Sequence, residues 1–131
     1  MATSSDAALA AEVAEALEAA RAAAGLGLPD PARLLEDAWR LLAHWDAECY
    51  GACCTDDPAY RDLRRDLADI AHVGDVLLVD TLTATIATAS GLPRSVTRPI
   101  ATFVVKHGFE TGRGLACPAW GRFVGAGSAA G

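Results

Sequence analysis

The strongest helical pattern in the chain is DPARLLEDAWRLLAHWDAECYGAC, residues 30–53. Asp30 is a typical N-cap residue, and Pro31 suits the first position of a helix, where its missing N–H costs nothing. Apolar residues then recur at intervals of three and four, which places them on one broad face. They are Leu34, Leu35, Ala38, Trp39, Leu41, Leu42, Trp45, Cys49 and Cys53. Because tryptophans bury a large apolar area, we expect this helix to anchor the core.

Helices are also predicted on both sides of this segment. Residues 5–24 carry an alanine-rich apolar face opposite a charged face, with a serine cap before it and a glycine stop after it. An Asp-Pro pair begins a third helix over residues 57–88, and we expect this helix to pass through Gly74 without a break. A fourth helix is expected over residues 95–111.

These segments predict an all-α fold, a small bundle of about four main helices. We expect one helical domain over residues 1–124 and a disordered tail over residues 125–131, whose sequence is GAGSAAG. The fourth helix has apolar residues on two faces and therefore needs two neighbours. We expect a homodimer that buries Val105, Phe109 and the segment around Trp120.

A second architecture competes for the middle of the chain. Residues 80–88, DTLTATIAT, alternate with a period of two and are rich in β-branched residues, which favours a strand. In this α+β alternative, residues 76–88 and 99–109 pair as a hairpin beneath the N-terminal helices. We favour the helix because three alanines within and just after this stretch weaken the case for a strand.

The charge balance excludes several classes of partner. The formal net charge is −6 and no basic stripe with interleaved aromatic residues exists, so neither nucleic acid nor an anionic membrane is an expected partner. The first residues lack the basic region of a secretory signal, and no apolar run is long enough to span a bilayer. We therefore expect a cytoplasmic protein. A single lysine, with no asparagine or glutamine, points to a high-GC bacterial genome.

Four cysteines are present, and a cytoplasmic location predicts that all four are free thiols. Cys49 and Cys53 lie four residues apart on one helical face, a spacing that suits two metal ligands, and Cys117 and His107 are the candidates to complete such a site. Cysteine is, however, among the most commonly buried small residues, and this pair lies within the tryptophan face. We expect no metal and no cofactor.

No recognised catalytic motif is present: the nucleophile elbow, a glycine-rich phosphate loop, the H-E-x-x-H sequence and the Glu-x-x-His pair of di-iron bundles are all missing. The catalytic candidates are therefore single residues, His107, Asp80 and Arg98. His107 lies in the middle of the apolar face of the fourth helix, where an imidazole either transfers protons or simply hydrogen-bonds a core group. Asp80 interrupts an apolar stretch and, if buried, needs Arg98 or His107 as a partner. Its helical position is equally compatible with an exposed side chain.

Further polar and aromatic side chains interrupt apolar faces and are candidates for binding a substrate. They are Thr81, Thr85, Thr88, Asp46, Tyr50 and Trp45. The threonines either line a cavity or bond to backbone carbonyls four residues back. Asp46 either faces a ligand or lies at the rim of the core.

Two classes of function fit this sequence. The first is a small, cofactor-free tailoring enzyme of bacterial secondary metabolism, which would carry out isomerase, lyase or cyclase chemistry by acid–base catalysis in a mostly apolar pocket. The alternative is a non-catalytic accessory protein that binds a small molecule, a peptide or a partner protein. The polar intrusions into apolar faces favour the enzyme, because a protein that only packs has little use for them.

Overall fold

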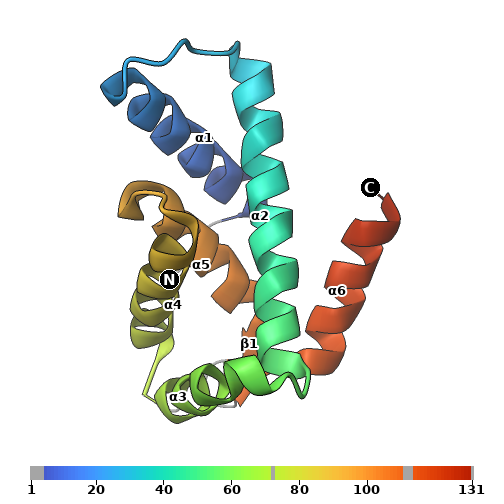
Figure 1. The fold of residues 1–131 in the computed structure, drawn as a ribbon. Coiled ribbons are helices and arrows are strands. Elements are labelled where there is room, and N and C mark those ends of the chain that lie inside the picture. Colours follow the sequence, from blue (N-terminus) through green and yellow to red (C-terminus); the bar gives the residue numbers. More distant parts are fainter. Residues whose placement is uncertain (1–4, 72, 111–113, 131) are drawn as a thin grey trace.

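The computed structural model describes residues 5–71, 73–110 and 114–130. These residues form six α-helices, a single 3-10 turn and one short pair of strands (Figure 1). The elements are α1 (Asp6–Ala23), α2 (Pro31–Cys54), η1 (Pro58–Tyr60), α3 (Arg61–Ala71), α4 (Asp75–Ser90), α5 (Arg94–Gly108), β1 (Phe109–Glu110), β2 (Gly114–Leu115) and α6 (Cys117–Ala130). The all-α class is thus confirmed, with six helices in place of about four. None of the described helices is both long enough and apolar enough to cross a bilayer.

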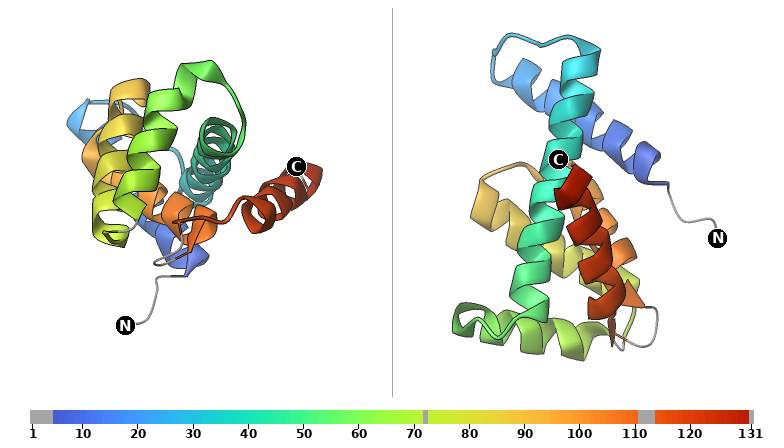
Figure 2. Two further views of the ribbon diagram at one scale, coloured as in Figure 1. Left: turned by 90° about the horizontal axis from the view of Figure 1, so that it is seen from below. Right: turned by 90° about the vertical axis from the view of Figure 1, so that its right-hand side faces the viewer.

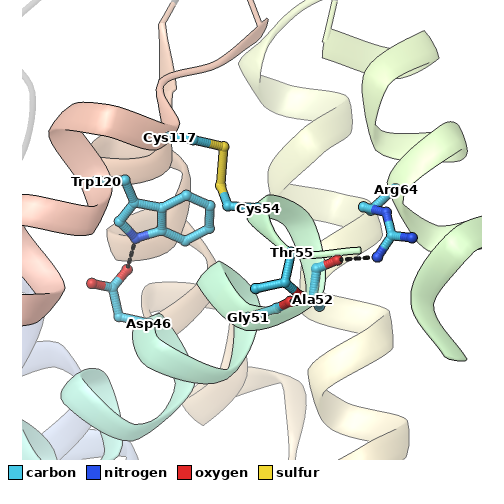
Figure 3. Close-up of a disulfide and its surroundings, with 8 residues drawn as sticks. All are labelled: Asp46, Gly51, Ala52, Cys54, Thr55, Arg64, Cys117 and Trp120. Carbon is cyan, nitrogen blue, oxygen red and sulfur yellow. Dashed lines mark hydrogen bonds between the residues drawn. A yellow bond between two sulfur atoms is a disulfide. The ribbon is translucent and has the colours of Figure 1, made fainter. Parts of the chain in front are cut away.

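Helix α2 is the central element, as its sequence predicts. The Asp30 side chain accepts a hydrogen bond from the backbone N–H of Arg33 at 3.0 Å, which caps the first turn. At the other end, Arg64 of α3 donates to the carbonyl of Ala52 at 3.1 Å (Figure 3). Figure 1 shows α1, α4 and α5 on one side of α2, α6 on the opposite side and α3 across its lower end. Other helices therefore pack against both flanks of α2.

The predicted third helix over residues 57–88 is wrong as a single element. The chain breaks at Gly74, whose φ of +153° is a conformation that side-chain-bearing residues rarely adopt, and Gly74 becomes the N-cap of α4. The α+β alternative is also wrong, because residues 76–88 lie in α4 and residues 99–108 lie in α5. A helix accommodates this stretch because threonine hydroxyls can donate hydrogen bonds to backbone carbonyls one turn back. Thr83, for example, donates to the carbonyl of Val79 at 2.6 Å.

Helix α5 runs through the middle of the molecule, which accounts for its two apolar faces. It contacts α1, α2, α4 and α6. Val105, Phe109 and Trp120, which the sequence assigned to a dimer interface, are all buried within the single chain. The physical reason for that assignment is therefore wrong, because other helices of the same chain cover both faces of α5. The dimer itself stays a prediction.

Helix α6 follows β2, in a segment for which the sequence predicted no element. A disulfide joins its first residue, Cys117, to the last residue of α2, Cys54, across a Cα–Cα distance of 5.8 Å. The prediction of four free thiols is thus wrong for this pair, whereas Cys49 and Cys53 are free and buried. Neighbouring cysteines on a helix point in different directions, so Cys53 enters the core while Cys54 faces α6. Figure 2 shows α6 set apart from the other helices beyond this junction.

Candidate functional site

A pocket of about 280 Å³ opens where α2, α5 and α6 meet. Its lining is almost entirely apolar, with one acidic side chain. The lining residues are Trp39, Ala43, Asp46 and Ala47 of α2, Phe103 of α5, and Phe123 and Val124 of α6. Residues at 39, 43, 46 and 47 recur at helical spacing, so they form one stripe along α2 that faces α6.

Asp46 is the polar centre of this pocket. Its side chain is buried, with 2% of its surface exposed, and its Oδ1 accepts a hydrogen bond of 2.9 Å from Nε1 of Trp120 (Figure 3). Figure 3 shows the second oxygen on the side away from the indole, and no described residue donates a hydrogen bond to it. Burial raises the pKa of Asp46 to about 6, and the hydrogen bond from Trp120 offsets only part of this effect.

Trp120 positions α6 against the rest of the protein. Its indole is completely buried and packs on Gly108, where an added Cβ would come within 2.7 Å of the ring. Tyr50 packs edge-on against the indole at a centroid distance of 5.5 Å. Since Phe123 lies three residues after Trp120, docking of the indole also brings Phe123 to the pocket.

His107 lies behind the aromatic wall of the pocket and is not among the residues that line it. Its ring stacks on Phe123 at 3.9 Å and lies 4.6 Å from the ring of Phe103. Its Nε2 is 3.0 and 3.1 Å from the two carboxylate oxygens of Asp6, which also accepts a hydrogen bond from Lys106 at 2.8 Å. Burial alone would raise the pKa of Asp6, but the hydrogen bonds from Lys106 and His107 outweigh it, and the pKa lies below its usual value.

The three predicted catalytic residues do not come together. Arg98 and Asp80 form an ion pair of 2.8 Å between α5 and α4, with about half of each side chain exposed. Asp80 therefore adopts the exposed alternative, and its partner is Arg98. An exposed pair of this kind contributes at most about 1 kcal/mol to stability. His107 pairs with Asp6 of α1, a partner that no sequence pattern indicated.

The predicted threonine stripe has a local role. Thr85 donates a hydrogen bond of 2.8 Å to the carbonyl of Thr81, four residues back, and Thr85 and Thr88 line a shallow hollow on α4. Thr85 also lines a smaller cavity of about 100 Å³ beside Trp45. Of the six predicted binding residues, only Asp46 lines the pocket between α2, α5 and α6, while Tyr50 supports it through Trp120.

The small cavity also contains the two free thiols. Burial raises the pKa of Cys49, and it raises that of Cys53 to about 11, so both are protonated thiols at neutral pH. Cys117 is bonded to Cys54 and cannot serve as the third thiolate ligand in this form. No group of three metal-ligating side chains occurs within the part of the chain that the structure describes.

Several pocket residues were missed because they carry no reactive group. The sequence places Trp39 on the core face of its helix, yet Trp39 and Phe123 are each 40% exposed and line the pocket. The only signal in the sequence was the 120–123 spacing of two aromatic residues in an otherwise small-residue tail.

Neither the family models, nor the curated proteins, nor the solved structures contain a match to this chain.

Proposed function

We propose that this protein binds a small, mostly apolar molecule in the pocket between α2, α5 and α6, with Asp46 as the polar group that orients it. One observation supports this proposal above the others. A buried carboxyl lines an apolar pocket, and one of its two oxygens accepts no hydrogen bond from any described residue.

The energetics of Asp46 favour a role in binding over a purely structural role. A pKa raised from 3.8 to about 6 means that ionisation of Asp46 costs the folded protein about 3 kcal/mol at neutral pH. An asparagine at this position would accept the hydrogen bond from Trp120 through its neutral amide oxygen, without the cost of ionisation. Costly buried polar groups that serve no packing purpose are typical of functional sites.

The pocket size favours a small ligand. Sites for drug-sized molecules usually measure about 300–1,000 Å³, and this pocket, with about 280 Å³, lies just below that range. A bound peptide would need an extended groove, which a single pocket of this size does not provide.

Filling the pocket is expected to abolish binding. Ala47 is exposed on the pocket wall, so Ala47→Leu places an isobutyl group in the cavity without disturbing the core. Two probes of one shape, tert-butylbenzene and phenyltrimethylammonium, are titrated while the backbone amide signals are followed by NMR. We expect saturable shifts at the pocket residues with at least one probe, and affinity reduced about tenfold or more in Ala47→Leu.

The matched control is Ala68→Leu, the same change at an exposed position of α3 outside the pocket. It is expected to bind like the unaltered protein. Equal binding by both variants, or shifts confined to residues outside the pocket, would rule out this site.

A second candidate, acid–base catalysis on the bound molecule, is favoured by one observation. A carboxyl whose pKa is raised to about 6 can both accept and donate a proton near neutral pH. In this version Asp46 replaces His107 as the proton-transfer group, because Asp46 lines the pocket. A titration midpoint near 4 for the Asp46 carboxyl carbon, followed by NMR, would remove this candidate.

A further inference from the structure

We infer that the ligand of this pocket is an organic cation, whose ammonium group lies against Asp46 and among the aromatic rings of Trp39, Phe103 and Phe123. The inference rests on the proposed function and specifies the class of ligand.

The charge of the pocket lining favours a cationic ligand. Every pocket-lining residue except Asp46 is uncharged, so the described lining holds no lysine or arginine to balance an ionised carboxylate. His107, which lies outside the lining and hydrogen-bonds to Asp6, is a positive charge that lowers the pKa of Asp46 but does not offset the effect of burial. A ligand ammonium would bring a positive charge into direct contact with the carboxylate, whereas a neutral donor would satisfy the oxygen without adding any charge.

The aromatic residues that line the pocket also favour a cationic ligand. Three aromatic rings line the same pocket as the carboxyl, and the negative faces of such rings attract cations that approach within about 6 Å. Trp39 and Phe123 line the pocket and are each 40% exposed, so part of each ring is accessible to a ligand, although His107 stacks on one face of Phe123; Phe103 is buried. Aromatic rings combined with a carboxylate are the usual means by which proteins recognise ammonium groups.

The charge of the whole chain acts in the same direction. A formal net charge of −6 attracts cations over long range and repels anionic ligands. The acidic surface and the acidic pocket therefore both favour a positively charged ligand.

The test compares the two isosteric probes, phenyltrimethylammonium and tert-butylbenzene, which differ only in the charged nitrogen. Binding to the full-length, oxidised protein is measured by calorimetry at a pH about two units above the pKa of Asp46, where the carboxyl is ionised. We expect the cation to bind about tenfold more tightly or better. In Asp46→Asn this preference should disappear, so that the ratio of the two affinities falls to about one.

Two further variants locate the effect. Asp80→Asn removes the same charge from the surface of α4, away from the pocket, and should retain the preference for the cation. Trp39→Leu keeps an apolar wall but removes an aromatic face, and should weaken cation binding roughly two- to fivefold. Thermal melting of each variant verifies that it is folded.

The outcomes distinguish a failure of the cation assignment from a failure of the proposed binding site. Equal affinity for both probes in the unaltered protein would overturn the cation assignment and leave the apolar pocket intact as a binding site. Tighter binding of tert-butylbenzene would do the same. Saturable binding of neither probe would overturn the assignment together with the proposed function.

Discussion

Loss of the Cys54–Cys117 disulfide is expected to lower the free energy of unfolding by about 4 kcal/mol. The bond closes a loop with a sequence separation of 63 residues, and the loss of chain entropy in the unfolded state grows with the length of such a loop. The change tested is Cys54→Ser together with Cys117→Ser. Urea denaturation should show a lower midpoint for this double variant than for the oxidised protein.

The reductant provides the control for this experiment. Reducing agent should destabilise the unaltered protein as much as the double serine substitution does, and it should leave the double variant unchanged. Without the bond, α6 is anchored mainly by Trp120, and the pocket depends on α6 for Phe123 and Val124. We therefore expect probe binding to weaken as well. A difference below about 1 kcal/mol between oxidised and reduced protein would show that the bond contributes little to the fold.

Asp46→Asn is expected to act in the opposite direction and to stabilise the protein by up to about 3 kcal/mol near neutral pH. The sign follows from the raised pKa. Between the unfolded value of 3.8 and the folded value of about 6, the folded protein holds the Asp46 proton more tightly than the unfolded chain does. Stability therefore falls as the pH rises through this window, and the loss is complete above the folded pKa.

Asparagine has no such titration and retains an oxygen that can accept the hydrogen bond of Trp120. Its unpaired amide hydrogens keep part of the burial cost, so about 3 kcal/mol is an upper limit. The stabilising effect should shrink towards zero as the pH is lowered to about 4. Asp80→Asn, at an exposed ion pair, is the matched control and should show no comparable gain. A less stable Asp46→Asn variant at neutral pH would mean that the carboxylate bond to Trp120 outweighs the cost of burial.

The candidate site was predictable only in part. Asp46 was identified because it interrupts an apolar face, and that is a property of the helix alone. Its depth of burial depends on α6, whose Trp120 covers it. His107 was also predictable only in part. Its half-buried position follows from its own helix, but its partner Asp6 lies 101 positions earlier in the chain.

The sequence by itself determined the helical class and the position of its principal element. Local rules were sufficient for this: the Asp-Pro cap at residues 30–31, the apolar stripe that follows it and the alanine-rich face of residues 6–23 act within a few turns of chain. The break at Gly74 was missed because glycine is tolerated within helices, and only the packing of α3 and α4 in different directions requires its unusual backbone.

Only the tertiary structure decided the disulfide, the burial of α5 and the pocket. Each of these joins residues far apart in the chain, as Cys54 and Cys117 do across 63 positions, and no local pattern encodes such distances. The pocket exists because α6, a segment of weak helical signal, docks on α2 through one buried indole and one covalent bond. Helix periodicity states which face of an element is apolar, but the identity of the surface that covers it depends on how all six helices pack together.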